Sequence, residues 1–224
     1  ILTRLLANYP DEAGSIYMAL SSAHGSANRP EEAEAAARRA VAALPDSPDA
    51  HRLLACSLID QDREPEAERS LRTALDLDPE DSQLFHLMSM TMAGMGRTEE
   101  ATFYAREAVR LSPGSASHHT LLAQVQMDTD AQAAEASLQE ALALEPAHAG
   151  ALLHLAQLRQ NQRDHVGAAK AAAAYAAHTS DPLQARAAVD AIFLSTVRAL
   201  HLGLIACIAL MLMSAAFVWL VNLP

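Results

Sequence analysis

Histidines and cysteines are the residues of this 224-residue chain best suited to bind a metal ion or act as nucleophiles. There are ten histidines and two cysteines, and they are scattered along the sequence. Zinc sites need three or four such ligands, usually with two at short spacing as in His-Glu-x-x-His or Cys-x-x-Cys. Neither motif occurs. We therefore predict no metal site, no cofactor and no disulfide framework.

Motifs for nucleophilic catalysis or phosphate binding are also missing. The sequence has no Gly-x-Ser-x-Gly and no glycine-rich phosphate loop. Paired carboxylates such as Glu31-Glu32 and Glu99-Glu100 open predicted helices, where negative charge suits the helix dipole. We predict no catalytic residue and no enzymatic activity.

The composition indicates the fold class and argues against one class of partner. The chain is 51% hydrophobic but only 4% aromatic, and alanine and leucine favour close-packed helices over sheets. Its net charge of −11 repels phosphates and argues against nucleic-acid binding. The basic residues are almost all arginine, Lys170 being the only lysine, which indicates a GC-rich bacterial coding sequence.

A regular sequence period organises the chain. Pro45, Pro79, Pro113 and Pro146 follow one another at nearly equal spacing, the last interval being one position shorter than the others. Alanine recurs twelve positions before each proline, at Ala33, Ala67, Ala101 and Ala134, and five positions before, at Ala40, Ala74, Ala108 and Ala141. Small side chains at fixed places let neighbouring helices approach closely. The period predicts an all-α solenoid of stacked helical hairpins.

Each predicted hairpin has a first helix and a breaker before its second helix. Leu20, Leu54, Met88 and Leu122 recur in the first helices, each followed by serine or alanine. The breakers are Asn28-Arg29-Pro30, Asp62-Arg63, Gly94-Met95-Gly96 and Asp128-Thr129-Asp130. The fourth repeat is one residue shorter than the others, and the deletion falls in the last of these turns, where a short loop absorbs it most easily. His51 and His119 occupy a core aromatic position, so we interpret them as packing residues.

These residues resemble the tetratricopeptide repeat (TPR), a family of helix-turn-helix units whose period is about 34 residues. The alanines and the closing proline match the family pattern best, whereas its glycine is serine or alanine here. The resemblance implies a TPR-like α-solenoid over residues 11–182, with repeats at about 11–45, 46–79, 80–113, 114–146 and 147–180. Residues 1–10 are predicted to be the tail of a truncated upstream repeat. Tyr175 in the weaker fifth unit is expected to cap the stack.

In such solenoids the first helices line a concave groove, where the family binds partner proteins or peptides. The outward positions that we expect there are Met18, Ser22, Arg52, Cys56, His86, Met90, Thr120, Gln124, Leu153 and Gln157. The lining is polar but largely uncharged, and an ordinary solvated face would look the same. The Lys and Asn clamp that some family members use for a terminal carboxylate is not supported. Self-association through this face or the end repeat is a further hypothesis.

The end of the sequence predicts a membrane anchor. Residues 202–221, Leu202–Val221, carry no charge, and twenty helical residues span about 30 Å, the thickness of a bilayer core. Residues 183–201 are predicted to form a juxtamembrane helix. Arg186 and Arg198 precede the span, which favours repeats on the cytoplasmic side of the membrane.

Two functions remain open from the sequence. The first is a membrane-anchored TPR scaffold that binds partner proteins or peptides through its concave face. The alternative is a regulatory repeat and membrane segment of a larger enzyme or transporter whose active part lies outside this chain. The start at Ile1, which is not methionine, and the end just after the predicted span keep the alternative open.

Overall fold

The computed structural model describes residues 12–178, which form ten α-helices and no β-strand. The predicted all-α fold is confirmed for this part of the chain. The helices are α2 (Ala13–Ser26), α3 (Pro30–Ala43), α4 (Pro48–Ile59), α5 (Glu64–Leu77), α6 (Ser82–Gly94), α7 (Thr98–Leu111), α8 (Ala116–Gln126), α9 (Ala131–Leu144), α10 (Ala149–Asn161) and α11 (His165–His178).

Three predicted segments lie outside the described residues. They are the upstream tail at 1–10, the juxtamembrane helix at 183–201 and the membrane helix at 202–221. Between residues 12 and 178, no helix combines the length and the apolar character needed to cross a bilayer. The membrane helix therefore remains a prediction from the sequence.

Contacts divide the chain into two compact units, one ending at Leu144 and the other beginning at Glu145. The first contains α2 to α9, which pair as four hairpins, and the second contains the hairpin of α10 and α11. The sequence suggested one continuous stack over residues 11–182. The two units are described separately below.

A left-handed residue closes most of the hairpin turns. Asn28, Asp62, Gly96 and Arg163 have φ values of 55°, 54°, 72° and 62°. The residue after each donates its backbone N–H to a carbonyl five positions earlier, as Arg63 does to Leu58 at 3.0 Å. This is the Schellman arrangement, which satisfies the last carbonyls of the first helix and turns the chain back. Asparagine, aspartate and glycine tolerate the left-handed region better than other residues.

The turn between α8 and α9 is built differently. No residue there has a positive φ, and the N–H groups of Thr129 and Asp130 both donate to the carbonyl of Gln126. Gly96 would have its counterpart at this turn, where the repeat is one residue short. The missing residue is thus the left-handed one, and the turn closes with shorter hydrogen-bonded rings instead.

Side-chain caps start four of the first helices. Ser47, Asp81 and Ser115 occupy the same position in successive repeats, and each side-chain oxygen accepts a backbone N–H from the first turn of α4, α6 or α8. At α10 the ring nitrogen Nδ1 of His148 accepts the N–H of Ala151 at 3.2 Å. Each cap satisfies an N–H that has no partner within its helix, so the periodic cap fixes where each hairpin begins.

Alanine controls the packing of the second helices α3, α5, α7 and α9. The predicted alanine positions are all buried, with exposed fractions of 0–2%, and so are the residues between them. These residues are Ala33, Ala37 and Ala40, Ala67, Leu71 and Ala74, Ala101, Ala105 and Ala108, and Ala134, Leu138 and Ala141. A methyl group at each close approach keeps the helices near one another. Larger apolar residues such as Leu54, Leu84 and Met88 fill the space between.

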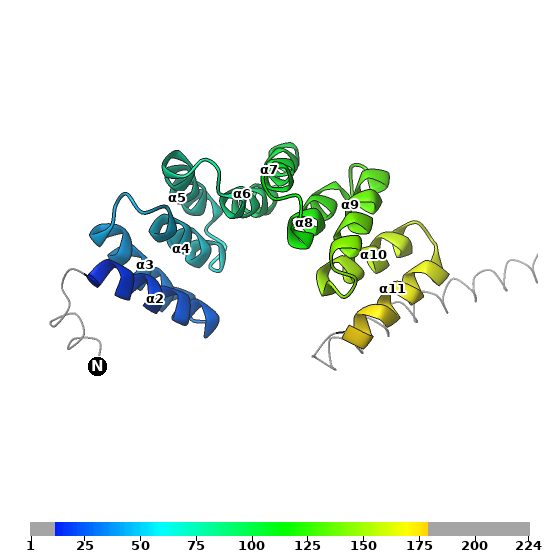
Figure 1. Ribbon diagram of the computed structural model, residues 1–224, viewed down its shortest axis with the longest axis horizontal. Coiled ribbons are helices and arrows are strands. Elements are labelled where there is room, and N and C mark those ends of the chain that lie inside the picture. Colours follow the sequence, from blue (N-terminus) through cyan, green and yellow to red (C-terminus); the bar gives the residue numbers. More distant parts are fainter. Residues whose placement is uncertain (1–11, 179–224) are drawn as a thin grey trace, which may run out of the picture. The chain divides into compact units, whose positions relative to one another are not determined.

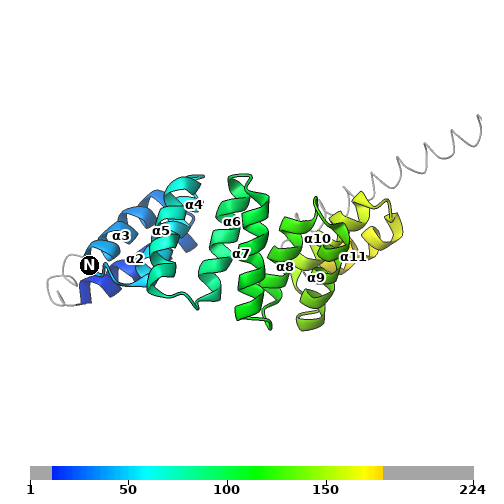
Figure 2. The same cartoon turned by 90° about the horizontal axis from the view of Figure 1, so that it is seen from above.

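The first helices of the first unit also touch one another in succession. Helix α2 contacts α4, α4 contacts α6, and α6 contacts α8. Figure 1 shows α5 and α7 on the side of the unit away from α4, α6 and α8, and Figure 2 shows α6 and α7 side by side with nearly aligned axes. We call the row of α2, α4, α6 and α8 the inner row.

The second unit has a small core of its own. Ala156 of α10 packs with Ala168, Ala171 and Ala172 of α11, and Leu155 lies against them. Tyr175, the expected capping residue, is buried in this unit with an exposed fraction of 6%. Alanine again permits a close approach of the two helices.

Replacing the left-handed Asp62 by glycine should stabilise the protein. We expect Asp62→Gly to raise the free energy of unfolding by about 0.5–1 kcal/mol, because glycine adopts positive φ without a steric penalty. Thr129→Gly is the matched control in the turn without a left-handed residue. It should lower stability by a similar amount, since glycine there adds chain entropy to the unfolded state and removes the Thr129 hydroxyl bond to Gln126. Urea denaturation followed by circular dichroism measures both changes, and a destabilised Asp62→Gly would contradict this account of the turns.

Candidate partner-binding face

The junction of α2 and α4 contains a pocket of about 220 Å³. Its lining combines small and polar residues with one leucine: Ser21, Ser22 and Gly25 of α2, Ala33 of α3, and Leu53, Cys56 and Ser57 of α4, with Asp60 at the end of α4. The structure therefore brings two of the predicted groove residues, Ser22 and Cys56, to one site. A third, Met18, lies at the same junction, where the Ser47 hydroxyl approaches its sulfur at 3.9 Å.

Small side chains are what keep this pocket open. A β-carbon added at Gly25 would meet no atom within 4 Å. The Ser57 hydroxyl is turned inward and donates to the carbonyl of Leu54 at 2.8 Å. Burial raises the pKa of the Cys56 thiol, so the thiol is neutral near pH 7 and acts as a small apolar group. Asp60 is exposed and supplies a negative charge. The pocket suits an aliphatic side chain next to a cationic or N–H donor group.

The junction of α6 and α8 holds a pair of histidines. The Nδ1 atoms of His86 and His118 lie 3.1 Å apart, with the ring centroids 5.2 Å apart. The other ring nitrogen of His118, Nε2, lies 3.2 Å from the hydroxyl oxygen of Ser82. Burial, followed by the charge of His118, lowers the pKa of His86 to about 4. Burial and then His119 lower the pKa of His118. Both rings are therefore neutral near pH 7, and one donates an N–H to the other.

His118 is the functional candidate that sequence reasoning missed. It is 2% exposed, and it meets His86 although the two belong to different hairpins. The signal was available in principle, because first helices of successive repeats touch and both of these helices carry a histidine. The pair is not recognised when each repeat is considered by itself, because its two histidines belong to different repeats.

The other predicted groove residues are placed as follows. Thr120, expected to point outward, is 7% exposed, and its hydroxyl donates to the carbonyl of Ala116 at 2.8 Å, so this placement was wrong. A threonine hydroxyl is readily held against its own helix by such a bond. Arg52 pairs with Asp49 at 2.7 Å on the same helix. Met90 and Gln124 are exposed on the inner row. Leu153 and Gln157 are exposed on α10, in the second unit.

Two histidines interpreted as packing residues have a more specific role. Nε2 of His51 lies 2.8 Å from the carbonyl oxygen of Pro45, and Nε2 of His119 lies 2.9 Å from that of Pro113. The acceptor is a carbonyl, so Nε2 carries the proton in both rings. Each histidine thus ties the start of a first helix to the proline that closes the preceding repeat.

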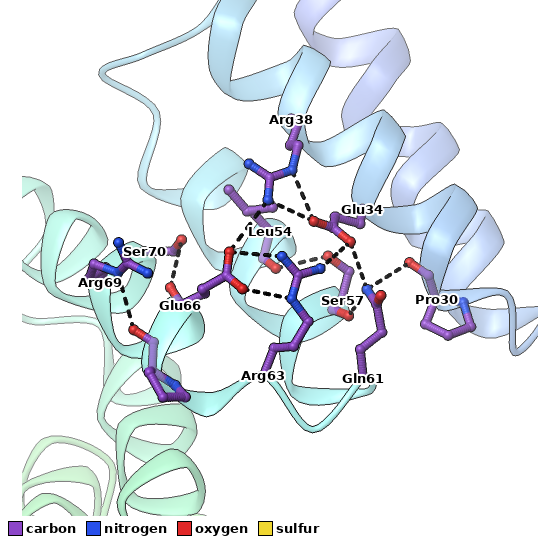
Figure 3. Close-up of polar contacts among 11 residues, drawn as sticks. Pro30, Glu34, Arg38, Leu54, Ser57, Gln61, Arg63, Glu66, Arg69 and Ser70 are labelled. Carbon is purple, nitrogen blue, oxygen red and sulfur yellow. Dashed lines mark hydrogen bonds and ion pairs between the residues drawn. The ribbon is translucent and has the colours of Figure 1, made fainter.

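A repeated ion network joins successive hairpins of the first unit (Figure 3). Arg63, at the start of α5, reaches Glu34 on α3 and Glu66 on α5, each at 2.7 Å. Glu34 also accepts the side-chain amide of Gln61 at 2.9 Å. Burial opposes ionisation of Glu34, but the bonds from Gln61, Arg38 and Arg63 outweigh it and lower its pKa. The charges are satisfied within the chain, so the network holds hairpins together and needs no partner.

The same network recurs one repeat later. Arg97 contacts Glu68 at 3.1 Å and also pairs with Glu100. At the next repeat the equivalent positions hold Thr102 in place of Glu68 and Asp130 in place of Arg97, so the series stops. We call these two networks the arginine ladder. Among residues 12–178, no group of three or more histidine, cysteine or carboxylate side chains is arranged to hold a metal ion.

Comparison with known proteins supports the family resemblance. Residues 24–91 match the family model described as tetratricopeptide repeat, which covers less than a third of the chain. The described residues have a TPR-like helical solenoid fold. This fold is typical of non-catalytic scaffolds for protein interaction. No curated protein matches the chain closely enough to count as a relative.

Solved structures of low sequence identity share the fold. A chain of the APC/C hetero-tetramer Cut9–Hcn1 superposes with a TM-score of 0.76 at 18% identity, and the match covers 88% of this chain and 39% of that one. TTC0263, a TPR protein of Thermus thermophilus, gives 0.72 at 22% identity, covering 81% and 99%. YrrB, described as a TPR protein with an unusual peptide-binding site, gives 0.58 at 16% identity, covering 84% and 97%. This chain thus spans well under half of the Cut9–Hcn1 chain that it matches.

The histidine pair should make stability depend on pH. In the unfolded chain a histidine binds a proton near pH 6.5, whereas folded His86 does so only near pH 4. The unfolded state therefore binds more protons between these values, and stability falls as pH drops through this window. Between pH 7.5 and 5.0, the free energy of unfolding of the unmodified chain should fall. In the double variant His86→Gln/His118→Gln this fall should be about 1 kcal/mol smaller. Urea denaturation at both pH values measures this.

His24→Gln, which lies outside the pair, is the control and should show the same pH dependence of stability as the unmodified chain. If the double variant also shows that dependence, the histidine pair is not its source.

Proposed function

We propose that this chain is a protein-interaction scaffold that holds a short peptide segment of a partner along the inner row. The observation that carries the proposal is the pocket between α2 and α4, which opens among predicted groove residues and is lined by small groups. The TPR-like fold supports it, because such repeats present preformed helices as a binding surface. YrrB supports it as well, since its description links this fold to peptide binding.

The chemistry of the pocket indicates the kind of segment that would bind. Its volume of about 220 Å³ is enough for one aliphatic side chain. Asp60 lies beside it, and the chain as a whole carries a net charge of −11. Arg52 pairs with Asp49 on the same helix, and it does not line the pocket. We expect an aliphatic anchor residue next to lysine or arginine.

Filling the pocket should abolish peptide binding. Peptides selected from a random library against the full chain in detergent are the probe, and fluorescence anisotropy measures their dissociation constants. We expect the selected sequences to pair an aliphatic residue with a basic one. Ser22→Tyr places a large ring in the pocket and should weaken their binding at least about tenfold.

Ala23→Tyr is the matched control. It adds the same ring at the next residue of α2, about 100° around the helix from Ser22, at an exposed position that does not line the pocket. Binding should be unchanged in this variant, and circular dichroism should show that both variants remain helical. Equal affinities in the Ser22 and Ala23 variants would show that the peptides bind elsewhere.

We further propose that residues 202–221 tether the scaffold to a membrane, with the repeats on the cytoplasmic side. The support is in the sequence: twenty uncharged residues, and Arg186 and Arg198 on the side of the repeats. A tether would raise the local concentration of any bound partner at the bilayer.

The tether can be tested by ending the chain after His201. The full chain should sediment with membranes, resist alkaline carbonate and require detergent for release, because its apolar segment is buried in lipid. The shortened chain should stay in the supernatant and keep the circular dichroism spectrum of a helical protein. A full chain that stays in the supernatant would overturn the anchor without touching the peptide proposal.

A further inference from the structure

The histidine pair between α6 and α8 places two ring nitrogens at a distance that one metal ion can bridge. The two Nδ1 atoms are 3.1 Å apart and come from adjacent hairpins. Imidazole nitrogens bind zinc and similar ions at about 2.0–2.1 Å. Two nitrogens at the observed separation would then form an angle of about 100° at a shared ion. That angle lies between octahedral and tetrahedral values, so the separation of the two nitrogens is compatible with a shared ion once both rings turn towards it.

We propose that His86 and His118 form a two-histidine site for a divalent transition metal, of the class of Cu²⁺, Ni²⁺ and Zn²⁺. The ion bridges α6 and α8 and so clips the third hairpin to the fourth. Neutral imidazole is the borderline-soft ligand that these ions prefer, whereas Mg²⁺ and Ca²⁺ prefer oxygen. The site lies outside the pocket at α2 and α4 and does not depend on the peptide proposal.

The surroundings of the pair favour ligation. Both Nδ1 atoms must be unprotonated to bind an ion, so each ring must carry its proton on Nε2. Ser82 is compatible with this need at His118, because its hydroxyl oxygen lies 3.2 Å from Nε2 and can accept a proton held there. An outer hydrogen bond of this kind orients a metal-binding histidine and fixes its tautomer. The lowered pKa values of both rings mean that neither is a cation near pH 7, so binding requires only that the ring with a proton on Nδ1 change to the Nε2 tautomer.

Access and ligand number set how tightly the site binds. His118 is 2% exposed, but His86 is only partly buried, so an ion can enter from its side. The described part of the chain adds no third histidine, cysteine or carboxylate to the group, and water completes the coordination. Affinity should therefore follow the order Cu²⁺ above Ni²⁺ and Zn²⁺, and it should be weaker than at three- or four-ligand zinc sites.

The test uses NiCl₂ and the full chain in detergent at pH 7.5. Binding to the folded state should raise the melting temperature in a manner that depends on Ni²⁺ concentration, whereas MgCl₂ should not. His86→Gln and His118→Gln should each remove the rise, and Ser82→Ala should weaken Ni²⁺ binding about tenfold or more by freeing the His118 tautomer. His24→Gln is the matched control and should keep the full effect.

A second readout separates this site from the eight other histidines of the chain. Paramagnetic Ni²⁺ should broaden the ring proton signals of His86 and His118 first, at substoichiometric ion. Circular dichroism must show that each variant is folded at the starting temperature, and a variant that is not folded is replaced by the corresponding phenylalanine. If both single variants keep the stabilisation by Ni²⁺, or if other histidine signals broaden first, the ion binds elsewhere and the proposal is overturned.

Discussion

Close approach of helices at alanine positions is the constraint on which the first unit depends. Each second helix buries two alanines at fixed positions, and at most 2% of each residue is exposed. A larger side chain there would push the hairpins apart and strain the core, since well-packed interiors tolerate added volume poorly. The left-handed turns and the periodic caps then fix where each helix begins and ends. This packing explains why alanines and prolines recur at regular spacing in the sequence.

The same constraint leaves the inner row free to vary. The contacts between successive first helices recur along the unit, but the side chains at these junctions differ. Between α2 and α4 they are small and leave a pocket, and between α6 and α8 they are two histidines in direct contact. A repeat protein can therefore keep one fold while the side chains at each junction between repeats differ. These differences give each junction its own binding chemistry.

The sequence predicted what the period controls. The paired helices, the buried alanines and the unusual fourth turn all follow from residues that recur at fixed spacing. It did not predict features that depend on which residues of adjacent hairpins meet, such as the contact of His86 with His118 or the burial of Thr120. The sequence contains the recurrence behind the arginine ladder, with Glu34, Arg63 and Glu66 followed one repeat later by Glu68, Arg97 and Glu100, but the prediction did not use it. Its ionic contacts could be assigned only once the turns placed the arginines beside the preceding hairpin.

The end of the arginine ladder makes the couplings between hairpins unequal. Ions in solution screen partly exposed charge pairs, and the effect grows with ionic strength. Salt should therefore weaken the coupling of the first hairpin to the second and of the second to the third. The coupling of the third to the fourth lacks ladder charges and stays nearly constant. In a stack whose stability is a sum of nearest-neighbour couplings, the salinity of the medium then shifts the relative strengths of these couplings.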